Sequence, residues 1–259
     1  MKPLPILIAV LAIGLTFCTD VEDPDPPVKP RLVEKSSGFD TLTQGIHPSM
    51  EQNAIVLQWY RNPDPDLAGY VIFRAADTTI EADLKFETLD SVWIFYANPT
   101  LLDSEYIDIN VELAMPYLYY IRAIDDAGNE SKPSDTARYT LAVKPSIESP
   151  KNGQEDLAPQ PLFSWKYTAS FQFSVDFFFI TLENMTTNEL VWRYATSRNR
   201  YDGTAQSVPY NTDGSASESS LSSEYLYRWR LDAYGMLNAQ GIEREGARSP
   251  WIFFKVKGE

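Results

Sequence analysis

His47 is the only histidine in a chain of 259 residues, so it is the first residue to consider for catalysis. Its surroundings, residues 44–48, contain Gly45 and Pro48 and are typical of a loop, where a solvated side chain is expected. A hydrolase triad needs a nucleophilic Ser and a carboxylate beside the imidazole, and no Ser of the chain lies in a nucleophile-elbow sequence. One His and one Cys also cannot supply the usual ligands of a transition metal. We therefore expect a protein that is not an enzyme, with no metal site and no cofactor.

Two acidic clusters have the oxygen atoms that calcium prefers. The first is Asp64 with Asp66, and the second is Asp125 and Asp126 with Asn129. Neither cluster has the spaced Asp/Asn, Gly and final Glu of a calcium loop. Asp and Asn also cap turns by bonding nearby backbone, and both clusters fall where the chain requires a turn. A turn-capping role is predicted for both.

Aromatic side chains offer a third kind of chemistry, which is stacking on a ligand or a partner. Trp93, Phe95 and Tyr96 lie in residues 91–96, a strand-like run that is apolar on both faces. The outer face of such a strand must be covered by the neighbouring domain, by a partner protein, or by a sugar ring stacked on Trp93 or Tyr96. These three residues are the candidate ligand or partner surface. The other tryptophans that the pattern singles out are Trp59, Trp165 and Trp229, which are predicted to be core, and Trp192, which ends another apolar run.

The formal net charge of -14 disfavours two classes of partner. Nucleic acid and anionic lipid headgroups both require a basic patch that neutralises phosphate, and no cluster of Lys and Arg stands out in the chain. We expect no nucleic acid, and a protein or carbohydrate partner of unknown identity.

The first 17 residues predict export. Lys2 precedes a nearly unbroken apolar run over residues 4–17, which suits a secretion signal and is short for a membrane span of roughly 20 residues. Residues 15–18, Leu-Thr-Phe-Cys, resemble the bacterial lipobox, which implies cleavage before Cys18 and lipid attachment to it. Phe17 departs from the small residue of that pattern. The alternative is cleavage after Gly14, which leaves Cys18 as a free thiol.

Residues 18–27 are acidic and rich in proline, and they predict an extended tether without a fold of its own. Acidic residues directly after the lipid-bearing Cys resemble the surface-export signal of some Gram-negative bacteria, and a solvated tether is the alternative. The resemblance implies an outer-membrane or cell-surface protein anchored through a lipid on Cys18, with a periplasm-facing position left open.

Residues 28–142 have the pattern of an all-β domain. Short alternating runs are separated by Pro, Gly, Asn and Asp, and Tyr117, Tyr119, Ile121 and Ala123 fall on every second position. Trp59, the turn at residues 66–70, Asp108 with Val111, the tyrosine strand and residues 128–131 together resemble a fibronectin type III domain. The resemblance implies a seven-stranded immunoglobulin-like sandwich with a core Trp and a tyrosine corner at Tyr117.

Residues 143–259 repeat this plan. Phe163-Ser164-Trp165 matches Leu57-Gln58-Trp59, and Leu221, Tyr227 and Ala233 reproduce the spacing of Val111, Tyr117 and Ala123. The chain is thus predicted to hold two tandem fibronectin type III-like sandwiches with a short, semi-rigid join near Val143. Residues 196–223 are predicted to be a long polar loop, which is either functional or mobile.

The chain as a whole resembles a bacterial lipoprotein with tandem fibronectin type III-like domains. We therefore predict a lipid-anchored envelope or surface protein that serves as a binding or adhesion module. The alternative is a structural spacer or a subunit of a larger envelope or secretion complex with no small ligand.

Overall fold

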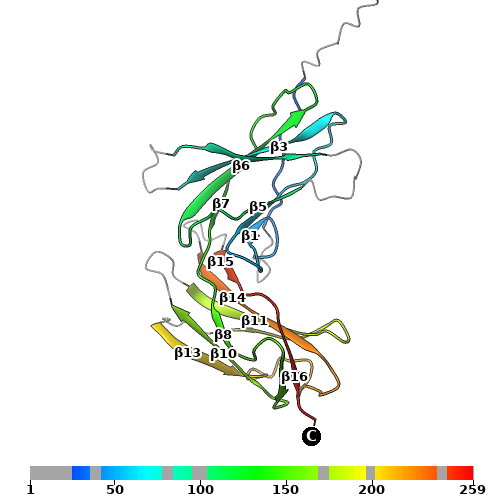
Figure 1. Ribbon diagram of the computed structural model, residues 1–259, viewed down its shortest axis with the longest axis vertical. Coiled ribbons are helices and arrows are strands. Elements are labelled where there is room, and N and C mark those ends of the chain that lie inside the picture. The colour runs from blue at the N-terminus through cyan, green and yellow to red at the C-terminus, as the bar shows by residue number, and fades with distance from the viewer. Residues whose placement is uncertain are drawn as a thin grey trace, which may run out of the picture.

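Strands alone make up the regular structure of this chain. The computed structural model describes residues 25–35, 42–77, 84–94, 104–168, 175–196, 202–237 and 244–258, and these residues form sixteen β-strands and no helix (Figure 1). The predicted leader at residues 1–17, Cys18 and residues 19–24 of the tether lie outside them.

The first seven strands form a sandwich of two antiparallel sheets. One sheet has the order β1-β2-β5 and the other the order β4-β3-β6-β7. This Greek-key arrangement of three strands against four is that of an immunoglobulin-like sandwich. The strands are β1 (Ile46–Pro48), β2 (Ile55–Gln58), β3 (Leu67–Ala76), β4 (Glu87–Trp93), β5 (Glu105–Asp108), β6 (Pro116–Asp125) and β7 (Ala137–Thr140).

The core of this sandwich follows from the period of two along its strands. On β6 the side chains of Tyr117, Tyr119, Ile121 and Ala123 are buried, and the residues between them are only partly buried. Trp59 meets Tyr70 edge to face, with 5.1 Å between the ring centroids. The prediction that this tyrosine strand faces a core is confirmed.

The remaining nine strands form the second sandwich. One sheet has the order β13-β10-β8, and the other has the order β12-β11-β14-β16-β9 with β15 also paired to β14. The strands are β8 (Ser146–Ser149), β9 (Gln154–Leu157), β10 (Leu162–Thr168), β11 (Val175–Asn184), β12 (Glu189–Ala195), β13 (Asp202–Pro209), β14 (Tyr227–Leu237), β15 (Arg244–Arg248) and β16 (Ile252–Val256).

Aromatic side chains fill the second core. Trp165, Trp192 and Trp229 are each at most 1 % exposed, and Phe163 packs between Trp192 and Trp229. Trp192, which the sequence placed only at the end of an apolar run, is therefore core. Its indole Nε1–H donates to Asp213 Oδ1 at 2.9 Å, so the buried ring keeps a polar partner at the surface.

Both sandwiches contain a tyrosine corner. The Tyr117 hydroxyl accepts a hydrogen bond from the backbone N–H of Glu112 at 3.1 Å, and the Tyr227 hydroxyl accepts one from Ser222 at 2.9 Å. The offset of five residues is the same in each case, which confirms the repeat that the spacing of Tyr117 and Tyr227 predicted.

The prediction of one long polar loop at residues 196–223 was wrong. Within it, β13 pairs antiparallel with β10 from Leu162↔Pro209 to Thr168↔Asp202. Beyond β13 the chain is held by side-chain bonds, such as that from Tyr210 Oη to the carbonyl oxygen of Glu218 at 2.6 Å. The strand is polar because it lies at the edge of its sheet, where water solvates one side.

Candidate interaction surface and domain junction

Trp93 lies at the end of β4, an edge strand that pairs with β3. With both sandwiches present the residue is 51 % exposed, so the neighbouring sandwich leaves about half of it open to solvent. Trp93 is paired with Gly69, and a Cβ atom at Gly69 would stand 3.2 Å from Cε3 of the indole. The absence of a side chain at Gly69 thus lets the ring lie against the backbone of β3, on the face turned away from the core.

More aromatic rings lie on the same face of this four-stranded sheet. Phe73 on β3 stacks on Tyr120 of β6 with 4.6 Å between centroids, and Phe86 contacts Tyr120 in a tilted arrangement at 4.8 Å. The Arg122 guanidinium lies 5.7 Å from the centroid of Phe73 and pairs with Glu130 at 2.9 Å. We call Phe73, Phe86, Trp93 and Tyr120 the aromatic face.

The predicted surface is described only in part. Trp93 is placed, whereas Phe95 and Tyr96 lie outside the described residues, as does Cys18. Phe73, Phe86 and Tyr120 were not predicted to accompany Trp93. Phe73 and Tyr120 pair across β3 and β6, and both face outward because their neighbours Ile72 and Tyr119 are buried in the core.

The two sandwiches share an apolar contact. Phe179 on β11 and Tyr234 on β14, from the second sandwich, join the apolar cluster of the first, which includes Leu42, Tyr139 and Leu141. Tyr234 is fully buried and stacks on Phe177 with 5.1 Å between centroids. Part of the outer face of the second sandwich is therefore covered by the first, with β1, β7 and β15 meeting at the join (Figure 1).

Backbone groups of β15 tie this junction together. Tyr139 Oη donates to the carbonyl oxygen of Gly246 at 3.2 Å, and the N–H of Gly246 donates to Tyr139 Oη at 3.1 Å. The same carbonyl accepts the N–H of Ala142 at 3.1 Å, and Arg138 pairs with Glu245 at 2.6 Å. Burial raises the pKa of Tyr139 well above its ordinary value, so its hydroxyl stays protonated and can donate.

His47 is not the solvated loop side chain that the sequence predicted. It lies in β1 and is only 8 % exposed, with Nδ1 3.2 Å from the carbonyl oxygen of Gly45. Burial lowers its pKa below the ordinary value of 6.5, and Arg248 of β15 lowers it further. The prediction failed because Gly45 and Pro48 suggested a loop, whereas the neighbouring sandwich covers this short strand.

Asp108 is a buried residue whose polar network the sequence did not reveal. Its carboxylate, 1 % exposed, accepts bonds from Arg74 Nη1 at 2.7 Å and from the Tyr119 hydroxyl at 2.9 Å. Burial and the Asp108 charge raise the pKa of Tyr119. Every member of the network has a partner, so it holds β5 against β3 and β6 and leaves no reactive group.

The turn-capping prediction is confirmed for Asp125, whereas the Asp64 carboxylate bonds a distant part of the backbone. Asp125 accepts bonds from the backbone N–H and the side-chain amide of Asn129, at 2.7 and 3.0 Å. Asp64 accepts the N–H of Val28 at 2.7 Å, which fixes the start of the first sandwich. Within the described residues, no group of three or more His, Cys, Asp or Glu side chains is arranged to hold a metal ion.

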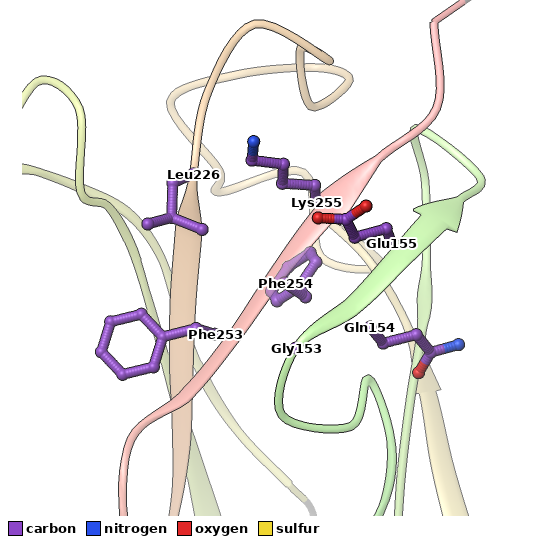
Figure 2. A pocket seen from close by; sticks show the side chains of 7 residues that line it. All are labelled: Gly153, Gln154, Glu155, Leu226, Phe253, Phe254 and Lys255. Atoms are coloured by element: carbon purple, nitrogen blue, oxygen red, sulfur yellow. The ribbon is translucent and has the colours of Figure 1, made fainter.

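A small pocket lies on the second sandwich beside the parallel pair β9 and β16. Leu226, Phe253 and Phe254 supply its apolar side, and Glu155 and Lys255 stand at its rim (Figure 2). It also includes Gly153 and Gln154. The pocket is shallow and open, and it holds no pair of carboxylates and no imidazole that could do chemistry.

Comparison with known proteins gives matches to solved structures alone. No protein-family model matches the chain, and no curated protein matches it. A fibronectin type III-like protein from Clostridium thermocellum is 17% identical, covers 44% of this chain and 92% of its own, and has a TM-score of 0.30. The first three fibronectin domains of chicken CNTN1 are 15% identical, with 90% and 67% coverage and a TM-score of 0.31.

The sheet orders, the two cores and the paired tyrosine corners decide the architecture. The chain is two tandem fibronectin type III-like sandwiches. Such sandwiches are commonly binding or spacer modules and typically not enzymes, although a fold alone does not assign a function. Among the residues that the structure describes, there is no helix with the length and apolar character needed to span a membrane.

Proposed function

We propose that this chain is an exported, lipid-anchored protein of a bacterial envelope or cell surface that binds a protein or glycan partner without catalysis. The leader at residues 1–17, the lipobox-like Cys18 and the acidic tether at residues 18–27 support the anchor. The single observation that carries the binding role is the half-exposed Trp93, which lies on the same face of the sheet as the stacked rings of Phe73 and Tyr120.

The aromatic face suits a binding surface for a physical reason. An exposed indole held against a sheet loses little freedom when a ligand stacks on it, so contact area is gained at small entropic cost. Arg122 and Glu130 beside the rings provide hydrogen-bonding groups for a polar ligand.

The binding role is tested with Trp93→Ala. We expect this variant to lose most retention on a glycan array or most capture of crosslinked envelope proteins, with unchanged thermal stability. Leu190→Ala is the matched control, because Leu190 is 45 % exposed on the second sandwich. Equal binding by wild type and Trp93→Ala would contradict this assignment.

The anchor is tested separately by metabolic labelling with a fatty-acid analogue. We expect wild type to be labelled and recovered with membranes, and Cys18→Ser to be neither. A Cys18→Ser chain that remains labelled would refute lipid attachment at this residue.

A spacer or subunit of a larger envelope complex is the second candidate function. The hydrogen-bonded junction at Gly246 favours it, since a bonded join transmits position and force better than a free linker. Capture of the same envelope proteins by wild type and Trp93→Ala would favour this role.

A further inference from the structure

The single histidine of the chain lies where the two sandwiches meet. Nδ1 of His47 faces the carbonyl oxygen of Gly45, and a carbonyl only accepts, so in the neutral ring the proton sits on Nδ1. The strand that carries this ring, β1, packs beside β15 of the second sandwich. The ring is therefore fixed in one tautomer at the interface.

The charges around His47 come from both sandwiches. Arg248 on β15 and Lys35, ahead of β1, are cations that oppose a positive imidazole, while Glu105 on β5 favours one. Arg248 is 6 % exposed, and its Nε stands 3.7 Å from Asp232 Oδ1.

Further charged and titratable groups lie at the junction, among them the Arg138–Glu245 pair that joins β7 to β15. Arg230 donates to Asp232 Oδ2 at 3.0 Å, so two guanidinium groups share this buried carboxylate. The hydroxyls of Tyr139 and Tyr234 also face Arg248. Lys144, near Glu51, donates to the carbonyl oxygen of Met50 at 2.7 Å.

We propose that His47 makes the junction sensitive to pH: protonation of its ring, in an interface that already holds Arg248 and Lys35, loosens the first sandwich from β15. Protonation favours the open form because the ring is buried in the closed form. Burial, Arg248 and Lys35 together outweigh the Gly45 hydrogen bond and Glu105, which raise the pKa of His47, and hold that pKa below 6.5 in the closed junction. Opening exposes the ring to water and removes Arg248. The open form therefore binds the proton more readily.

The neutral His47 ring stabilises the closed junction fully above pH 6.5. This stabilisation falls as the pH drops below 6.5 toward the pKa of His47 in the closed form. Each pKa unit between the closed and open forms changes the open-to-closed ratio about tenfold. The open-to-closed ratio stops rising once the pH is low enough to protonate His47 in the closed form as well.

The first experiment is a proton NMR titration of the full chain. The imidazole proton signals can be assigned to His47 without ambiguity because the chain has one histidine. We expect a midpoint below the ordinary value in wild type and a higher midpoint in Arg248→Met. Arg228→Met is the matched control, because Arg228 is on β14 of the same sheet but pairs with Glu183 at 2.6 Å. An ordinary midpoint in wild type overturns the proposal.

The second experiment measures opening by small-angle X-ray scattering at about pH 7.5 and about pH 5, on either side of the histidine range. We expect the maximum dimension and flexibility of wild type to increase at the lower pH, and those of His47→Gln to change much less. If His47→Gln does not fold, Arg248→Met replaces it and should show a reduced response. An equal response in both chains overturns the proposal, because shared carboxylates would explain it, and so does no response in wild type.

Discussion

The hydroxyl of Tyr139 and the backbone of Gly246 form a reciprocal pair of hydrogen bonds. The Gly246 N–H donates to the Tyr139 oxygen at 3.1 Å, and the Tyr139 hydroxyl donates to the Gly246 carbonyl at 3.2 Å. Tyr139 belongs to β7 and Gly246 to β15, so one side chain of the first sandwich hydrogen-bonds both backbone polar groups of a residue in the second. The join between the sandwiches is thus a specific contact.

Tyr139→Phe should destabilise the junction while keeping the ring in place. The change removes both bonds and leaves the buried N–H of Gly246 without this acceptor, which costs about 1 to 3 kcal/mol. Urea unfolding measures the loss in the free energy of unfolding. Tyr60→Phe is the control because Tyr60 is 43 % exposed, and an equal effect of the two changes would contradict the structure.

Gly246→Ala should be more damaging than its single added methyl suggests. The new Cβ would clash with the carbonyl oxygen of Ala233 in the paired β14 and stand 3.3 Å from Leu42 Cδ1 of the first sandwich. Overpacking typically costs about 1 to 3 kcal/mol and occasionally more, and a clash with backbone falls at the upper end because the carbonyl cannot easily move. Differential scanning calorimetry should show a lower Tm, whereas Gly258→Ala, whose Cβ would be 3.5 Å from the Ser223 side chain, should leave it unchanged.

The two tyrosine corners should contribute different amounts to the free energy of unfolding. Tyr227 Oη accepts the Ser222 N–H and also donates to Glu218 Oε2 at 2.9 Å, so Tyr227→Phe removes two bonds. Tyr117→Phe removes the hydrogen bond that the backbone N–H of Glu112 donates to the Tyr117 hydroxyl at 3.1 Å. At about 1 kcal/mol for each bond, guanidinium unfolding should show roughly twice the loss for Tyr227→Phe. A larger loss for Tyr117→Phe would contradict this.

The repeat and its cores could be predicted from local pattern. Alternation along Tyr117 to Ala123, and its echo at Tyr227 and Ala233, reports which side of a strand faces a core, and that is a property of a few neighbouring residues. The corner at Tyr117 was implied by the resemblance to a fibronectin type III domain, and the repeated spacing placed Tyr227 at the equivalent position of the second sandwich.

The junction could not be predicted in this way. Phe179 and Tyr234 point to the outer face of their own sandwich, and only the position of the first sandwich buries them. His47 became a buried strand residue for the same reason, and β13 was taken for a loop because a polar edge strand lacks apolar alternation. These features depend on contacts between segments far apart in the chain.

Asp108→Asn should strongly destabilise the first sandwich. The buried carboxylate accepts bonds from Arg74 and Tyr119, and its loss leaves Arg74 without its counter-charge, at a cost of about 3 kcal/mol. Chemical denaturation monitored by tryptophan fluorescence measures this. Asp135→Asn is the control, since its pair with Lys29 is exposed (side chains 91% and 46%) and should contribute well under about 1 kcal/mol. Similar losses for both would refute the network.

Asp213 should make stability depend on pH in the acid range. Slight burial raises its pKa, but hydrogen bonds from Trp192 Nε1 and Ser215 outweigh this and lower the pKa below the ordinary value of 3.8. A lowered pKa in the folded state means that the contribution is present above pH 3.8 and is lost as the pH falls through the folded-state value. Asp213→Asn keeps an acceptor for Trp192 but removes the charge. Its Tm should therefore lie below that of wild type at neutral pH, and the difference should shrink as the pH falls toward the folded-state pKa of Asp213. A Tm difference that stays the same from neutral pH to about pH 2 would show that the charge is not the cause.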